Sequence, residues 1–364
     1  MSEYLGPGSI FAGCRLEAVA GRGGMGVVFR ATQLALERPV ALKAIAPEFA
    51  MDTQYRERFQ RESHLAASID HPNVIPVYEA GESDGTLYLI MRWVEGTDLR
   101  TLLDSSGRMS PGRAIKLLRP VASALAAAHR RGLVHRDVKP ANVLITRGEE
   151  EDEDHIYLTD FGIARQTGGE SLTRTGLFVG TLDYAAPERI SGARGDAPSD
   201  IYSFGCMLFE AVAGHAPFDR PSDVSKMFAH MNDPVPSVRK EVDDVPDQLD
   251  SLISKSMAKR PEDRPASASE LTVALGRVLH ELDTAEREAA APQGRADVTK
   301  IRASQIVAEP AALTEPSGAA APLTEPSGPV TEPAAAVTAP TKPTTEPAAA
   351  LTEPSAPVTA PTAP

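Results

Sequence analysis

The stretch "HRDVKPAN" occupies residues 135–142 and decides how the rest of the chain is interpreted. Asp137 follows Arg136, with Lys139 two residues after it and Asn142 five residues after it. A carboxylate and an amide oxygen at this spacing suit a site that holds a hydroxyl and a hard metal cation together, because such cations prefer oxygen ligands. One octapeptide leaves the chemistry open, and the other motifs of the chain have to agree with it.

The bulk composition excludes several classes of protein. The 364 residues carry a formal net charge of −13, which argues against a general nucleic-acid binder that would need a basic face. Cys14 and Cys206 are far apart, so neither a disulfide framework nor a structural zinc site is expected, and a reducing compartment is favoured. The chain shows no signal peptide and no run of roughly 18 apolar residues. We therefore expect a cytoplasmic protein without a membrane span.

The composition changes near residue 285. From Ala290 to Pro364 there is no Phe, Tyr or Trp, and 14 of the 31 prolines occur there. Such a segment cannot bury enough apolar surface to offset its chain entropy. Thr-Glu-Pro recurs irregularly in it, starting at Thr314, Thr324, Thr331, Thr345 and Thr352. We predict a disordered Pro/Ala/Thr-rich tail over residues 290–364, either a spacer or a docking site for phosphothreonine-reading domains.

The part before the tail divides into two regions. Residues 10 to about 93 contain short strand-like runs with one helical pattern near residues 52–68. Residues 99–286 are mainly helical, with the clearest patterns at 111–131, 199–213 and 267–282. The pattern predicts an α+β fold with a small β-rich lobe before a larger α-helical lobe. A ligand cleft is expected at their junction.

Two motifs in the first region suit phosphate binding. "GRGGMGVV" at 21–28 spaces its glycines so that backbone N–H groups can approach phosphate oxygens. Alone it could be an ordinary turn, and strand-forming residues after it disfavour a dinucleotide site. Lys43 ends "VALK", and Glu62 follows on the predicted helix, where it could fix the lysine by an ion pair. In isolation either residue would be a surface charge.

Two motifs in the second region suit phosphoryl transfer. In "HRDVKPAN", Asp137 could orient a hydroxyl and accept its proton, and Lys139 could neutralise charge on the transferred group. Asn142 and Asp160, which opens "DFG", supply oxygen ligands for Mg²⁺, with Mn²⁺ as an alternative. The sequence "AAPE" follows at 185–188.

In this order, these motifs resemble the signature set of the Hanks-type serine/threonine protein kinases, and among them the bacterial, actinobacterial-style members. The resemblance covers residues 10–283 and implies the bilobal protein-kinase fold, with an N-lobe at about 10–93 and a C-lobe at about 94–283. It implies a non-specific serine/threonine protein kinase that moves the γ-phosphate of ATP to Ser/Thr hydroxyls of proteins. Lys139, with Thr181 before "AAPE", matches the serine/threonine branch.

The resemblance also implies the roles of single residues. Lys43 would pair with the ATP phosphates and with Glu62, while Asp137 and Lys139 would act at the reacting hydroxyl. Met91 stands at the gatekeeper position, and adenine would bond to backbone near Arg92 and Val94, although family members often have an acid in place of Arg92. The residues expected to contact ATP or its metal are Gly21, Arg22, Gly23, Gly24, Met25, Gly26, Val28, Ala41, Lys43, Met91, Arg92, Val94, Asn142 and Asp160.

Further family positions are expected to be structural. His135 and Phe161 are expected to pack between the lobes rather than to react. Glu188 would form an ion pair with Arg264, and Asp200 would anchor the backbone of the catalytic loop.

Regulation is expected in the segment between "DFG" and "AAPE". Thr173 and Thr175 occupy the place where family members are phosphorylated, and Arg136 is the expected partner of the phosphate. We expect the chain to phosphorylate itself there in trans, the alternative being a flexible loop rich in Ser and Thr. A transient homodimer would assist this step. The acidic run at 149–154 is expected to be a solvated turn rather than a metal site.

Two other functions stay open as alternatives. A scaffold that binds nucleotide without transferring phosphate is disfavoured because Lys43, Glu62, Asp137, Asn142 and Asp160 are all present. A kinase for small molecules is disfavoured by residues 181–188, which resemble a peptide-binding loop. The expected partners are therefore proteins that bear Ser or Thr, including a second copy of the chain.

Overall fold

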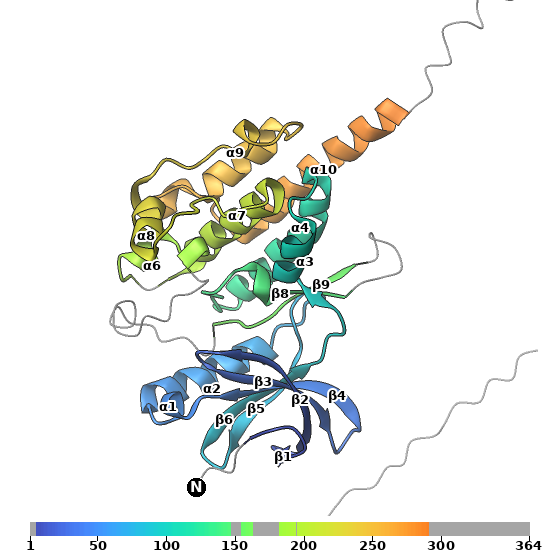
Figure 1. Cartoon of the computed structure of the whole chain (residues 1–364), viewed down its shortest axis with the longest axis vertical. Coiled ribbons are helices and arrows are strands. Elements are labelled where there is room, and N and C mark those ends of the chain that lie inside the picture. The colour runs from blue at the N-terminus through green and yellow to red at the C-terminus, as the bar shows by residue number, and fades with distance from the viewer. Residues whose placement is uncertain (1–4, 147–153, 163–181, 194, 291–364) are drawn as a thin grey trace, which may run out of the picture. The chain divides into compact units, whose positions relative to one another are not determined.

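The computed structural model describes residues 5–146, 154–162, 182–193 and 195–290 (Figure 1). All of them lie within one unit, Met1–Gly294. The strand-rich part comes first along the chain and the helical part follows it. The α+β, bilobal class predicted from the sequence is confirmed for this part of the chain.

The N-lobe is a six-stranded antiparallel sheet. Short connections join its strands, and successive side chains along each strand point to opposite faces of the sheet. The strands follow the order β1-β2-β3-β4-β6-β5. They are β1 (Ile10–Phe11), β2 (Cys14–Gly23), β3 (Gly26–Gln33), β4 (Arg38–Ile45), β5 (Val77–Ser83) and β6 (Thr86–Arg92).

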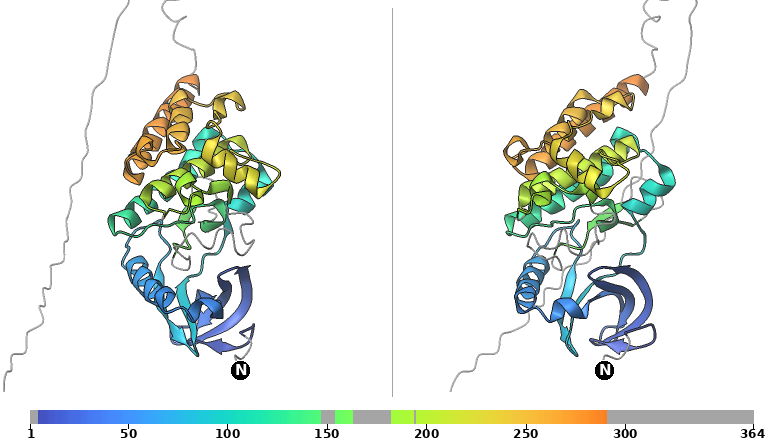
Figure 2. Two further views of the ribbon diagram at one scale, coloured as in Figure 1. Left: turned by 90° about the vertical axis from the view of Figure 1, so that its left-hand side faces the viewer. Right: turned by 60° about the vertical axis from the view of Figure 1, so that its left-hand side comes forward.

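Two helices interrupt this sheet between β4 and β5. The short α1 (Pro47–Ala50) precedes α2 (Thr53–Ala67). Asp52 caps α2, because its carboxylate accepts hydrogen bonds from the backbone N–H groups of Gln54 and Tyr55. The helix α2 packs along β5 (Figure 2). Glu62 is among the buried residues of α2.

The register of β4 positions two of the residues expected to contact ATP. Lys43 pairs with Val28 of β3 and Leu89 of β6, while Ala41 pairs with Met91. Ala41 and Lys43 are two residues apart and therefore share one face of the sheet. Shifting the strand by one residue would turn both side chains to the opposite face.

A small three-stranded sheet joins the two lobes. Its strands are β7 (Thr97–Asp98), β8 (Val143–Thr146) and β9 (His155–Leu158). Val143 pairs with Leu158, so Asn142 and Thr159 lie at the same end of this hairpin. That register brings the ends of two motifs together, "HRDVKPAN" before β8 and "DFG" after β9.

The C-lobe is helical and is built around α7. This helix is buried from Ser199 to Val212, and α4 packs against both α7 and α10. The helices are α3 (Leu99–Ser106), α4 (Pro111–Arg130), α6 (Pro187–Ile190), α7 (Ala197–Ala213), α8 (Asp223–Asn232), α9 (Asp247–Ser256) and α10 (Ala268–Ala290). Short 3₁₀ turns at Pro140–Asn142, Leu182–Tyr184, Val238–Lys240 and Pro261–Asp263 connect them.

The end of the helical part differs from the sequence expectation. α10 continues past Leu282 to Ala290, because Ala, Glu and Arg in "AEREAA" are strong helix formers. The first residue assigned to the tail is therefore helical. The rest of that tail, residues 291–364, lies outside the described residues, and its disorder stays a prediction. Among the helices that the structure does describe, none combines the length and apolarity that crossing a membrane requires.

Candidate active site

The loop that contains "HRDVKPAN" is hydrogen-bonded to the buried helix α7. Asp200 accepts hydrogen bonds from the backbone N–H groups of His135 and Arg136, both at 2.7 Å, and its Oδ2 lies 2.8 Å from Nε2 of His129. Burial would raise the pKa of Asp200, but the hydrogen bond and charge of His129 hold it below its usual value. The anchoring role expected for Asp200 agrees with this geometry.

His135 has a structural place in the loop, as its sequence position suggested. It is fully buried, which lowers its pKa. Its Nδ1 accepts from the backbone N–H of Asp137, so the other ring nitrogen donates to the carbonyl oxygen of Thr159 at 2.9 Å. The ring packs on Phe161 with 4.8 Å between centroids. His135 thereby joins the catalytic loop to the segment that carries Asp160.

Two predicted residues of the loop contact the carboxylate of a third. Nζ of Lys139 lies 2.9 Å from Oδ2 of Asp137. The side-chain amide of Asn142 donates to the backbone oxygen of Asp137 at 2.7 Å and to its Oδ2 at 3.2 Å. The 3₁₀ turn Pro140–Asn142 folds the chain back to make these contacts. Asp137, Lys139 and Asn142 therefore form one polar group.

Asp160 comes after the other strand of the β8–β9 hairpin, next to Thr159, whose backbone N–H donates to the carbonyl oxygen of Asn142. It adopts the left-handed conformation, with a φ of 57°, and its Oδ1 lies 2.7 Å from Nζ of Lys43. Burial would raise the pKa of Asp160, and the charge of Lys43 outweighs that effect and lowers it. Asn142 donates to Asp137 through its nitrogen, so its amide oxygen is the atom suited to a metal. Two such oxygens fit Mg²⁺, which usually keeps several waters and binds substrate phosphates.

The expected ion pair between Lys43 and Glu62 is replaced by two others. Lys43 pairs with Asp160, whereas Oε1 of Glu62 accepts from Nη1 of Arg136 at 2.8 Å. Glu62 and Arg136 are both buried, and a buried carboxylate requires a partner. Arg136 has a φ of 60° and reaches the inner face of α2 from the catalytic loop. The sequence offered no signal for this pairing, because the family pattern pairs Glu62 with Lys43 and no motif links Glu62 to Arg136, 74 positions away.

The glycine-rich stretch forms the hairpin between β2 and β3. Gly23 pairs with Gly26, so Gly24 and Met25 occupy the turn. A Cβ atom on Gly21 or Gly23 would meet nothing within 4 Å, which leaves open space beside the backbone of Gly21, Arg22 and Gly23. The Met25 side chain instead packs against the main hydrophobic core. Its expected contact with a nucleotide would therefore use the backbone.

Four residues predicted to contact ATP belong to one apolar cluster. Buried Ala41 and Met91 contact Ile75 and Tyr157, and Val28 and Val94 pack against this group. The guanidinium of Arg92 lies 5.3 Å from the centroid of the Tyr157 ring. The Arg92 side chain is exposed and lies over this ring, so its charge stays at the protein surface rather than inside the apolar cluster.

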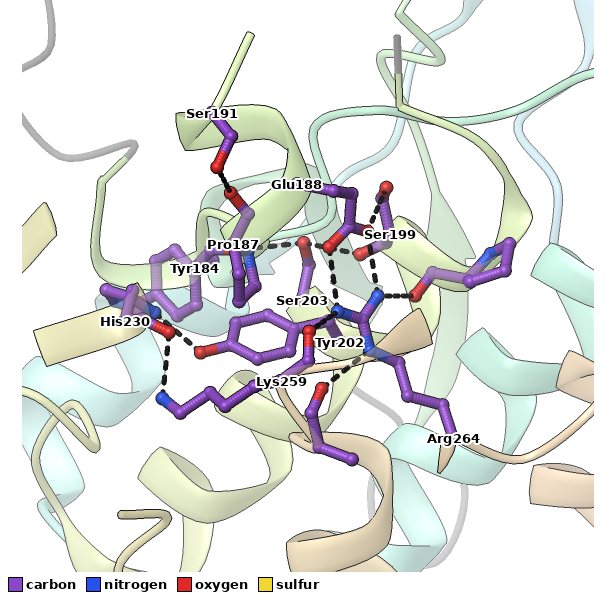
Figure 3. Close-up of polar contacts among 12 residues, drawn as sticks. Tyr184, Pro187, Glu188, Ser191, Ser199, Tyr202, Ser203, His230, Lys259 and Arg264 are labelled. Carbon is purple, nitrogen blue, oxygen red and sulfur yellow. Dashed lines mark hydrogen bonds and ion pairs between the residues drawn. The ribbon is translucent and has the colours of Figure 1, made fainter. Parts of the chain in front are cut away.

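A buried ion pair of the C-lobe holds the beginning of α6, which contacts the catalytic loop. Both oxygens of Glu188 accept from the guanidinium of Arg264 at 2.7 Å, and Ser199 donates to the same carboxylate at 2.6 Å (Figure 3). Burial would raise the pKa of Glu188, but the Arg264 hydrogen bond lowers it. This is the ion pair that the sequence predicted. The next residue, Arg189, donates to the backbone oxygen of Arg136, which ties α6 to the catalytic loop.

Several predicted positions lie outside the described residues. Thr173, Thr175 and Thr181 are among them, and so is the acidic run except for its last residue. That residue, Asp154, forms an ion pair with Arg113 of α4. Among the residues that can be described, no group of three or more His, Cys, Asp or Glu side chains could hold a metal ion.

Comparisons with known proteins agree with this geometry. The family model described as "Protein kinase domain" matches residues 15–274. The chain is 39% identical over 323 residues to the serine/threonine-protein kinase PknH of Mycobacterium bovis, which covers 88% of this chain and 53% of PknH. It is 38% identical over 341 residues to PknE of Mycobacterium tuberculosis, covering 90% and 57% of the two chains. The chain thus spans about half the length of these relatives.

Solved structures show the same likeness. The crystal structure of the Mycobacterium tuberculosis PknI kinase domain matches with a TM-score of 0.60 and 32% sequence identity. The match covers 75% of this chain and 99% of that domain.

Proposed function

The chain belongs to the protein kinase family, and from that premise we propose that it transfers the γ-phosphate of ATP to serine and threonine hydroxyls of proteins. The observation that carries the proposal is a pair of polar contact groups, Asp137 with Lys139 and Asn142, and Lys43 with Asp160. The backbone hydrogen bond from Thr159 to Asn142 holds the two groups next to each other. The relatives named serine/threonine-protein kinases support the serine/threonine class.

The proposed mechanism is an in-line displacement at the γ-phosphorus. The substrate hydroxyl oxygen attacks, the bond to the bridging oxygen of ADP breaks, and Asp137 orients the hydroxyl and takes its proton. Lys139, 2.9 Å from that carboxylate, neutralises charge on the transferred group. Lys43 binds the α- and β-phosphates. Positioning and charge neutralisation supply most of the catalysis.

The proposed cofactor is ATP with Mg²⁺, or Mn²⁺ as an alternative. Asn142 and Asp160 would hold the metal, which neutralises phosphate charge when it is bound. The backbone of residues 21–26 would cover the phosphates. Val28, Ala41, Met91 and Val94 would enclose adenine, with hydrogen bonds to backbone near Arg92 and Val94.

The proposed regulation is an exchange of partners at Arg136. Phosphate on Thr173 or Thr175 carries about −1.5 to −2 charges and would compete with Glu62 for the Arg136 guanidinium. Once released, Glu62 becomes available to Lys43, the pair that the family pattern predicts. The 2.8 Å contact between Glu62 and Arg136 supports this proposal, because it gives the phosphate a defined competitor.

The proposal extends to the bounds of the kinase domain and to the partners of the chain. We place the kinase domain at residues 10–283, supported by the family match to 15–274. Partners would be Ser/Thr-bearing proteins, a second copy acting in trans through a transient homodimer, and phosphothreonine-reading domains at the Thr-Glu-Pro tail. Cys14 and Cys206 are free and buried, which supports a cytoplasmic location.

The decisive test compares the full chain with Asp160→Ala in Mg²⁺ and ATP. We expect the wild type to label itself and a generic acceptor protein on Ser and Thr, and the variant to label neither. Mass spectrometry would map the phosphosites, with Thr173 and Thr175 expected among them. A wild type that binds nucleotide and transfers no phosphate would contradict the proposal and favour a scaffold.

A further inference from the structure

The single tryptophan of the chain, Trp93, directly follows β6. It stands between Arg92 and Val94, the two residues whose backbone is proposed to bond adenine. Its half-buried side chain packs against the apolar cluster proposed to enclose adenine, and the indole N–H donates to Oε1 of Glu95 at 2.8 Å. The position of this side chain therefore bears on the backbone on both sides of it.

The guanidinium of Arg30, on β3, lies over the indole ring. Its central carbon is 5.5 Å from the ring centroid, a distance at which the positive charge is attracted to the face of the ring. Nη2 of Arg30 is 3.4 Å from Oε1 of Glu95, the same oxygen that the indole N–H contacts. Arg30, Trp93 and Glu95 thus contact one another in all three pairs.

A fourth residue attaches Arg30 to β2. Nε of Arg30 is 3.3 Å from Oε2 of Glu17, and the other oxygen of that carboxylate accepts from the Thr32 hydroxyl at 2.5 Å. Arg30 is exposed, and a single exposed ion pair contributes little. Several contacts share this guanidinium, however, so they hold it in one position together.

The register of the sheet places Arg30 on the face that carries the proposed nucleotide site. Arg30 is directly opposite Ala41 of β4, and directly opposite residues share a face. Val28, two residues earlier on β3, lies on the same face and packs against the apolar cluster. Because β3 begins at Gly26, Arg30 connects the strand that leaves the glycine-rich turn to the residues proposed to bond adenine.

We propose that Arg30 is a positioning residue for the nucleotide, acting through Trp93 and Glu95. The inference rests on the proposed function and deepens it, because it names what links β3 to the adenine side of the site. Without the guanidinium, that link is lost and adenine is held less closely. Arg30 does not touch the reacting atoms, so its loss weakens nucleotide binding and leaves the rate of phosphoryl transfer at saturation in place.

The test measures the Kd of the full chain for ADP with Mg²⁺ by calorimetry, because this readout needs no phosphoryl transfer. Arg30→Met keeps an apolar stem without the charge, and it should raise the Kd about fivefold. Arg30→Lys, which keeps a charge, should recover about half of the loss. The KM for ATP should rise with the Kd, whereas the kcat at saturating ATP should stay within about twofold of wild type.

Arg38→Met is the matched control, because Arg38 makes a similar contact on the same sheet. Its guanidinium lies 3.8 Å from the centroid of the Tyr78 ring. Arg38 precedes Ala41 by three residues on β4, and strand alternation therefore turns it to the opposite face. The Kd of this variant should equal that of wild type. The fluorescence of Trp93 should change in Arg30→Met and stay constant in Arg38→Met.

A double variant tests whether the contact with the ring is the cause. Arg30→Met with Trp93→Leu should bind ADP about as weakly as Trp93→Leu alone, because coupled residues do not add. An unchanged Kd in Arg30→Met, an equal rise in Arg38→Met, or a multiplied loss in the double variant would each overturn the proposal. If thermal melting shows Trp93→Leu unfolded, the comparison of Arg30→Met with Arg38→Met decides.

The same measurements separate this inference from the kinase function. A wild type that binds ADP but transfers no phosphate would contradict the kinase function alone, and the Kd values would still decide the role of Arg30. A wild type that binds no ADP would overturn both.

Discussion

The buried ion pair of Glu188 and Arg264 fixes the position of α6. The Arg264 side chain is fully buried and satisfies Glu188 through two hydrogen bonds, with its guanidinium 5.0 Å from the Tyr202 ring centroid (Figure 3). Bidentate geometry of this kind is the strong form of an arginine–carboxylate contact. The pair fixes the beginning of α6, from which Arg189 reaches the catalytic loop.

We predict that Glu188→Gln lowers the free energy of unfolding by about 2–3 kcal/mol at pH 7, because Arg264 keeps a buried charge without its counter-ion. The folded-state pKa of Glu188 is depressed, so its stabilisation is complete above the ordinary value of 4.5 and is lost as the pH falls through the lower folded pKa. Urea unfolding at several pH values would show the gap between wild type and variant shrinking below pH 4.5.

The matched control for this prediction is Glu262→Gln. Glu262 pairs with Arg260 at the surface, and such pairs contribute little. No measurable change in stability is expected for it. A wild-type advantage over Glu188→Gln that stays constant down to pH 3 would contradict the assigned cause.

The glycines on the two sides of the turn between β2 and β3 differ in their surroundings. Gly26 has a φ of 143°, and a Cβ atom there would lie 2.0 Å from the backbone oxygen of Ala44. Gly21 faces open space. Both glycines belong to the same motif, but only Gly26 is required by the packing of β3 on β4.

We predict that Gly26→Ala lowers the free energy of unfolding by about 2 kcal/mol or more, because backbone atoms of β4 must move. Gly21→Ala should change it by less than about 0.5 kcal/mol and act, if at all, on the KM for ATP. Thermal or urea unfolding of both variants is the measurement. Equal stability losses would mean that the close approach to Ala44 is not the cause.

The elements also show what the sequence could predict. Motif residues such as Asp137 and Asn142 are close in the chain, and one 3₁₀ turn brings them together, so their spacing carried the information. Partner choice between distant residues did not follow from spacing. Glu62 meets Arg136 rather than Lys43, and Glu210 meets Arg100 across 110 positions, because helix packing decides these contacts.

For the whole molecule, the pairs at Glu62 and Lys43 join the two lobes. Glu62 and Lys43 belong to the N-lobe, whereas Arg136 and Asp160 belong to the C-lobe side of the site. Any change of partner at Arg136 therefore alters how α2 is held against the catalytic loop.

We predict that phosphorylation of Thr173 and Thr175 raises activity roughly 5- to 150-fold, the usual range of a coupling free energy. It should also change hydrogen exchange in α2, because Glu62 leaves Arg136. Activity and exchange are compared before and after phosphatase treatment. Thr173→Ala with Thr175→Ala should keep the low activity in both states, and a fully active double variant would rule out the exchange.

Met91 has a consequence for inhibitor chemistry. It belongs to the apolar cluster proposed to enclose adenine and also lines a small cavity of about 20 Å³, together with Lys43, Leu89, Asp160 and Phe161. Methionine is unbranched and has three rotatable side-chain bonds, so this border adapts its shape more readily than a branched residue would. Because the cavity has room for about one water molecule, a compound at the proposed adenine site can extend a group past Met91 only when that side chain changes its conformation. Such a compound would use a movement that ATP itself does not need, which offers a route to selectivity.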